Sequence, residues 1–114
     1  MACYRVEIER EVRKEIRRLP GNFRQRALRA LKGLRREPRP HDSEELDLGK
    51  TEIQLQSRTE LRRIRMGAWR IVYFIEEDDN LVSVLAVRKR PPYQYEDLRM
   101  LMESAIPTKK NNPP

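Results

Sequence analysis

The chain has 114 residues and a formal net charge of +7, and charged and hydrophobic side chains each make up 38% of it. This length allows one domain of ordinary size; we expect residues 1–106 to form it, with 107–114 as a flexible tail. A single cysteine excludes an internal disulfide, and the sequence lacks the ~20 consecutive apolar residues of a membrane span. We therefore expect a soluble, cytoplasmic protein whose excess of arginine favours a polyanionic partner.

The first third of the chain predicts a strand followed by a helical hairpin. Residues 4–9 alternate apolar and polar side chains, which is typical of a half-buried strand. Apolar residues then recur at helical spacing from Val12 to Leu19 and again from Phe23 to Leu34. Because only Pro20-Gly21-Asn22 separates the two patterns, we expect two antiparallel helices joined by a short turn.

The rest of the chain predicts three consecutive antiparallel strands. Residues 39–60 are acidic and lack periodicity, so we expect a long loop in which only Ile53 and Leu55 favour a short strand. Three segments rich in β-branched, aromatic or alternating apolar residues follow, separated by Gly67 and by a polar turn. They cover residues 61–66, 69–75 and 81–87. Residues 95–103 are compatible with a C-terminal helix.

This order of elements predicts an α+β fold. We expect the helical hairpin to pack on a mostly antiparallel four-stranded sheet, in the order strand-helix-helix-strand-strand-strand. The last strand is almost continuously apolar, as expected for a strand at the centre of a sheet or covered on both faces.

Several common catalytic devices need residues that this sequence does not have. His41 is the only histidine, which excludes a ribonuclease mechanism with paired histidines and a histidine-rich metal site. We interpret His41 as a solvated loop residue. The four glycines are scattered and form no phosphate-binding loop. Cys3 begins a strand without a nearby base, which favours a core or edge residue over a nucleophile.

Arginines on the predicted strands are the best candidates for chemistry. Arg63 and Arg65 lie two residues apart, so both point to one face with about 7 Å between them along the strand. Arg70 begins the next strand beyond the Gly67 turn, and Arg88-Lys89-Arg90 closes the last one. If these strands pair in order, the guanidinium groups come together and suit a phosphate, for which their planar fork is well shaped.

Other interpretations of these side chains remain open. Charged residues also protect strand edges from aggregation, which would explain each arginine taken singly. Basic residues on the helices, such as Arg17 and Arg18, favour a solvated surface that steers a partner. Trp69 suits core packing better than stacking on a base, because it lies between a glycine turn and an apolar strand.

The pattern resembles the RelE/ParE toxin superfamily, in particular RelE-like toxins that cut messenger RNA on the ribosome. The resemblance covers roughly residues 3–98, and its most specific part is a signature of the form R-I-R-x-G-x-W/Y-R-x-x-Y. The matching stretches are Tyr4-Arg5-Val6, Arg17-Arg18-Leu19-Pro20, Glu37-Pro38-Arg39-Pro40, Arg63-Ile64-Arg65-Met66-Gly67-Ala68-Trp69-Arg70-Ile71-Val72-Tyr73 and Val84-Leu85-Ala86-Val87-Arg88-Lys89-Arg90.

The resemblance implies an endoribonuclease that needs no metal or cofactor. The ribose 2′-hydroxyl would attack the adjacent phosphate and leave a cyclic phosphate. By their positions in the motif, Arg63, Arg65 and Arg90 would stabilise the transition state and Arg70 would position the phosphate. A tyrosine near the carboxyl end would act as base. Tyr93 and Tyr95 both lie near its place, and Pro91-Pro92 leaves the register between them open.

The resemblance also implies partners and two alternative functions. A cognate antitoxin would wrap a helix around the toxin or add a strand to it, and its acidic residues would neutralise the basic site. The ribosome and its messenger RNA would supply the substrate. One alternative is a ParE-like inhibitor of DNA gyrase, a branch that lacks the basic catalytic set. The other is a basic nucleic-acid-binding module without catalysis.

Overall fold

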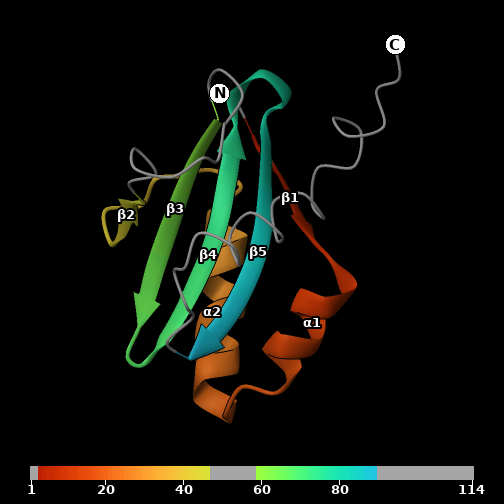
Figure 1. Ribbon diagram of the computed structural model, residues 1–114, viewed down its shortest axis with the longest axis vertical. Coiled ribbons are helices and arrows are strands. Elements are labelled where there is room, and N and C mark those ends of the chain that lie inside the picture. Colours follow the sequence, from red (N-terminus) through yellow and green to blue (C-terminus); the bar gives the residue numbers. More distant parts are fainter. Residues whose placement is uncertain (1–2, 47–58, 90–114) are drawn as a thin grey trace.

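Two helices cover one face of a five-stranded sheet (Figure 1), in a computed structural model that describes residues 3–46 and 59–89. The predicted α+β class is confirmed, but the sheet has five strands rather than four. The elements are β1 (Arg5–Ile8), α1 (Arg10–Arg17), α2 (Gly21–Gly33), β2 (Ser43–Glu45), β3 (Thr59–Met66), β4 (Trp69–Glu76), a 3-10 turn (Glu77–Asp79) and β5 (Leu81–Lys89). The predicted features at residues 53–55, 95–103 and 107–114 lie outside the described residues.

The strands lie in the order β1-β5-β4-β3-β2 (Figure 1). β1 runs parallel to β5, and the other three pairs are antiparallel. The additional strand, β2, falls within the segment predicted as a loop. Its sequence Ser-Glu-Glu has no apolar alternation, and it is held by pairing with β3, where Glu44 lies opposite Arg63. Periodicity cannot detect a short polar edge strand of this kind.

The helices form where apolar residues recur at helical spacing. Pro20 precedes α2 with a φ of −56°, a value that its ring fixes and that suits a helix start. Val12 and Ile16 of α1 and Ala27 and Leu31 of α2 are buried against the sheet. The two helices therefore present one apolar stripe each to the same core.

The turn between β3 and β4 fixes the register that the site depends on. Met66 pairs with Trp69, so only Gly67 and Ala68 form the turn. Gly67 has a φ of +61°, a conformation that glycine adopts without a steric penalty. A Cβ atom added to Gly67 would lie 3.4 Å from ring carbons of Phe23 in α2. The helix therefore packs closely against the turn.

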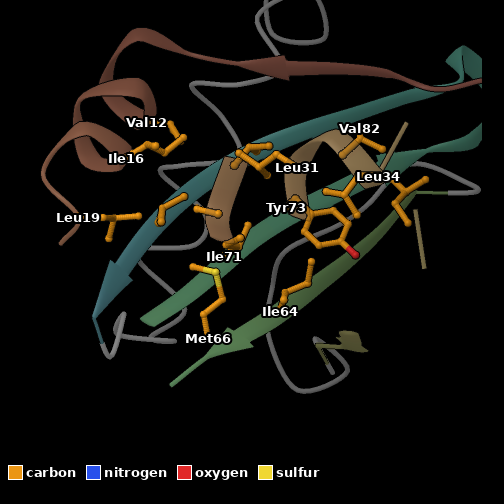
Figure 2. Packing of buried hydrophobic residues seen from close by; sticks show 14 residues of the cluster. Val12, Ile16, Leu19, Leu31, Leu34, Ile64, Met66, Ile71, Tyr73 and Val82 are labelled. Carbon is orange, nitrogen blue, oxygen red and sulfur yellow. The ribbon is translucent and has the colours of Figure 1, made fainter. Parts of the chain in front are cut away.

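The core lies between the helices and the sheet (Figure 2). Tyr73 is fully buried there, and its hydroxyl donates a 2.7 Å hydrogen bond to the Pro38 carbonyl. Burial raises the pKa of Tyr73 above its ordinary value. Residues Val82 to Val87 of β5 are all buried, and β5 lies between β1 and β4, as its continuous apolar run predicts.

Candidate functional site

Arg63, Arg65 and Arg70 lie on the face of the sheet that points away from the helices. The intervening Ile64 and Met66 belong to the core on the helical side, so alternation along β3 sends Arg63 and Arg65 the other way. Arg65 lies directly opposite Arg70 in the register between β3 and β4. Directly paired residues point to the same face, with Cβ atoms about 4.5–5.5 Å apart.

Glu44 of β2 inserts a carboxylate between two of these arginines. Its Oε1 atom forms an ion pair with Arg63 and lies 3.6 Å from the guanidinium of Arg65. The hydrogen bond and charge of Arg63, with smaller contributions from Arg65 and Arg70, lower the pKa of Glu44. Glu44 is therefore a carboxylate anion at neutral pH, and it shows that this group of guanidiniums attracts an oxyanion.

The three arginines differ in how much of each side chain solvent can reach. The side chain of Arg63 is 15% exposed, whereas that of Arg65 is 61% exposed. Arg70 is half-buried and is held by the turn: its guanidinium donates to the Gly67 carbonyl at 2.7 Å and to the Trp69 carbonyl at 3.0 Å. Arg65 is thus the most accessible cation of the three, and Arg70 has its orientation set by the backbone.

Arg88 continues the same row of residues into β5, opposite Arg70. Its Nε donates to Glu15 Oε2 of α1 at 2.7 Å, while Glu15 Oε1 accepts the Val87 backbone N–H at 2.7 Å. β1 pairs with β5 only as far as Val84, so Glu15 satisfies an amide on an edge that has no strand partner there. Arg88 is consequently drawn toward α1.

Not every predicted site residue falls within the described part of the chain. Arg63, Arg65 and Arg70 come together as the strand pairing predicts. Arg90, Tyr93 and Tyr95 lie outside the described residues. The sequence interpretation missed Glu44, which was assigned to the acidic loop. The net charge of −3 on residues 39–60, beside basic strands, was the one signal that pointed to such a contact.

The other side chains that the sequence singled out lie in the core or on the surface. Trp69 is half-buried against the core and packs on Phe23 with 6.4 Å between ring centroids, which agrees with core packing. His41 is exposed in a turn, and Cys3 is exposed just before β1. Arg17 and Arg18 are exposed, as expected of a solvated helix surface.

Within residues 3–46 and 59–89, no three His, Cys, Asp or Glu side chains gather as metal ligands do. Neither described helix is long and apolar enough to span a membrane. Charged side chains on the described part of the sheet form the group of arginines with Glu44 and a second cluster, in which Glu60 pairs with Arg39 and Arg62, and Arg39 also pairs with Glu77.

Residues 6–91 match the model of a family described as the ParE toxin of the type II toxin–antitoxin system parDE. No curated protein matches the sequence.

Similar solved structures are toxins alone or with their antitoxins. The archaeal RelE–RelB complex from Pyrococcus horikoshii is similar with a TM-score of 0.65 and 27% identity, covering 79% of this chain and 98% of that one. The RelBE2 complex from Mycobacterium tuberculosis has a TM-score of 0.58 and 22% identity, covering 78% and 100%. The isolated RelE toxin of E. coli has a TM-score of 0.51 and 17% identity, covering 87% and 96%. The last two support the fold alone.

Proposed function

Since the chain belongs to the ParE toxin family of type II toxin–antitoxin systems, we propose that this toxin acts as a ribosome-dependent messenger-RNA endonuclease. The observation that carries the proposal is the grouping of Arg63, Arg65 and Arg70 on one sheet face around the carboxylate of Glu44. Guanidinium groups arranged in this way bind the non-bridging oxygens of a phosphodiester. The substrate would place the protein in the cytoplasm.

In the proposed reaction, the ribose 2′-oxygen attacks the neighbouring phosphorus and the bond to the 5′-oxygen breaks. The products are a 2′,3′-cyclic phosphate and a 5′-hydroxyl. Arg65, with Arg63 and Arg90, stabilises the charge that grows on the phosphate oxygens, and Arg70 positions the phosphate. Arginine stays protonated in proteins, so the phenolate form of Tyr93 or Tyr95 is proposed to accept the 2′ proton, and a water molecule to donate a proton to the departing 5′-oxygen. Orientation of the message by the ribosome would supply much of the rate enhancement.

Inhibition of DNA gyrase is the second candidate function. The description of the matching family model favours it, because that model is named for ParE. The grouped arginines favour RNA cleavage, since an inhibitor that acts only by binding has no need of several cations held toward one phosphate. A cognate antitoxin is proposed as a partner for either function. The similar structures from P. horikoshii and M. tuberculosis each contain a toxin bound to its antitoxin.

Induced expression of the toxin in a bacterial host separates the two functions. An endonuclease produces discrete cuts in translated messages, which primer extension maps, and Arg65→Ala abolishes them. A gyrase inhibitor instead leaves trapped DNA breaks and induces the DNA-damage response. Arg17→Ala is the control, because Arg17 is an exposed arginine on α1 and is not one of the sheet arginines. DNA breaks without message cuts would overturn the proposed cleavage.

A further inference from the structure

A basic hollow lies at the C-terminal end of α2, formed by residues other than the sheet arginines. It has a volume of about 480 Å³, and its lining contains four cations and no carboxylate. The cations are Arg29, Lys32, Arg35 and Arg36, which are all exposed. None of the four makes a side-chain ion pair or hydrogen bond within the described part of the chain. Unpaired guanidinium and ammonium groups around one hollow are suited to bind a polyanion.

A second hollow lies between α2 and the edge of β3 at Arg65 and Met66, which β2 does not pair with. Its volume is about 220 Å³, and Arg26, Arg29 and Arg65 all line it, together with the carboxylate of Asp42. Arg29 lines both hollows, so the two adjoin at this residue. Cations thus follow one another from the edge of β3 at Arg65, across α2, to Arg36. The portion from Arg26 to Lys32, which lies within α2, spans about 9 Å at the rise of a helix.

The helix end alone does not explain this arrangement. Cations are favoured near the C-terminus of a helix by its dipole, which accounts for Lys32 and the residues after it. Arg26 and Arg29 lie further back in α2, where the dipole has little effect. Arg26 packs over the ring of Phe23, with its guanidinium carbon 5.2 Å from the ring centroid, and this contact orients it beside the second hollow.

The composition of the surface favours RNA over a protein partner. Protein interfaces depend on apolar and aromatic anchors at their centre. The large apolar side chain that stands exposed on the described part of the molecule is Leu28, and it lines neither hollow. Nucleic-acid interfaces are more polar and far more positive.

We propose that α2 carries a track for single-stranded RNA, on which the backbone of a strand held at Arg65 passes around the edge of β3 and continues over Arg26 and Arg29 into the hollow formed by Lys32, Arg35 and Arg36. The proposal rests on the proposed function for the identity of the strand as a messenger. The track contributes affinity and direction, and the sheet arginines contribute the chemistry.

The test is binding of a fluorescein-labelled 2′-O-methyl oligoribonucleotide, which cannot be cleaved because its 2′-oxygen is blocked. The track variant combines Arg29→Gln, Lys32→Gln and Arg36→Gln. The matched control combines Arg10→Gln, Arg17→Gln and Arg24→Gln, which removes the same charge from exposed helical residues that line neither hollow. Fluorescence anisotropy over a series of salt concentrations gives the affinity, and circular dichroism confirms that both variants fold.

The track variant is expected to bind roughly tenfold more weakly or worse, with a salt dependence shallower by about 2 in log K against log salt, while the control stays near wild type. Equal losses in both variants would show a general charge effect and overturn the track, as would no loss in either. Polyglutamate that binds as tightly as RNA and loses affinity in the same variant would make the hollow a site for an acidic peptide instead. RNA binding without message cleavage would refute the proposed function and leave the track standing.

Discussion

Arg65 and Arg70 lie directly opposite each other across the β3–β4 pair, with like charges on the same face of the sheet. Like charges in directly opposed positions destabilise a sheet. Glu44 compensates part of this repulsion by placing its carboxylate beside Arg65 and Arg63. A like-charged pair that costs stability is typical of a functional site, because selection for folding alone favours two residues that attract each other at these positions.

The first prediction separates stability from function at Arg65. Arg65→Thr places a β-branched residue opposite Arg70 and removes the like-charge pair, so the free energy of unfolding is expected to stay constant or rise by about 0.5 kcal/mol. Message cleavage is expected to be lost in the same variant. Urea unfolding measures the first quantity and primer extension the second. A large loss of stability would show that Arg65 serves the fold.

The second prediction concerns the carboxylate in the arginine group. Glu44→Gln removes the anion that competes with phosphate for Arg63 and Arg65, so a non-cleavable RNA oligonucleotide is expected to bind several-fold more tightly. Glu45→Gln is the control, because Glu45 is the exposed neighbour and lies opposite Arg62 rather than Arg63. An equal gain in RNA affinity in both variants would show that only the net charge of the protein matters, and would contradict a specific role for Glu44.

The third prediction follows from the lowered pKa of Glu44, whose cause is the hydrogen bond and charge of Arg63. A carboxylate with a lowered pKa in the folded state stabilises the fold above its unfolded pKa. This contribution is lost as the pH falls through the folded value. Glu44→Gln is therefore expected to flatten the acidic side of the curve of unfolding free energy against pH. Identical slopes for the variant and the wild type below pH ~4.5 would contradict the ion pair.

The fourth prediction concerns Glu15, which joins α1 to β5. Glu15→Ala leaves the Val87 amide without its acceptor and releases Arg88, so the free energy of unfolding is expected to fall by about 1–3 kcal/mol. Glu11→Ala is the matched control, since Glu11 is 81% exposed and lies 3.7 Å from Lys14 in a surface pair. Similar losses in both variants, measured in urea, would refute a specific role for Glu15.

The helices and the three long strands could be predicted because their apolar residues carry the period of each element. Val12 and Ile16 repeat once per helical turn, and Ile64 and Met66 alternate along β3. β2 could not be predicted, because Ser43–Glu45 is stabilised by pairing with a strand that follows it in the chain. Its charge complementarity to Arg62 and Arg63 appears only when the register is known.

The arginine part of the site was predictable for a local reason. Period two determines the face of Arg63 and Arg65, and the short turn at Gly67 places Arg70 opposite Arg65. The carboxylate partners were not predictable, because they come from distant segments. Glu44 lies 19 residues before Arg63, and Glu15 lies 73 residues before Arg88. No local pattern in the sequence specifies such contacts.

The most direct measurement is cleavage of a defined end-labelled message by the purified toxin, with and without translating ribosomes. The wild-type toxin is expected to cut only when ribosomes are present, and to leave 5′ fragments that end in a 2′,3′-cyclic phosphate. Arg65→Ala is expected to cut at least about 100-fold more slowly, as when one donor to a transition-state oxyanion is removed, while Arg17→Ala keeps the wild-type rate. Wild-type cutting by Arg65→Ala, or an intact message in every reaction, would contradict the assignment of the sheet arginines to RNA cleavage.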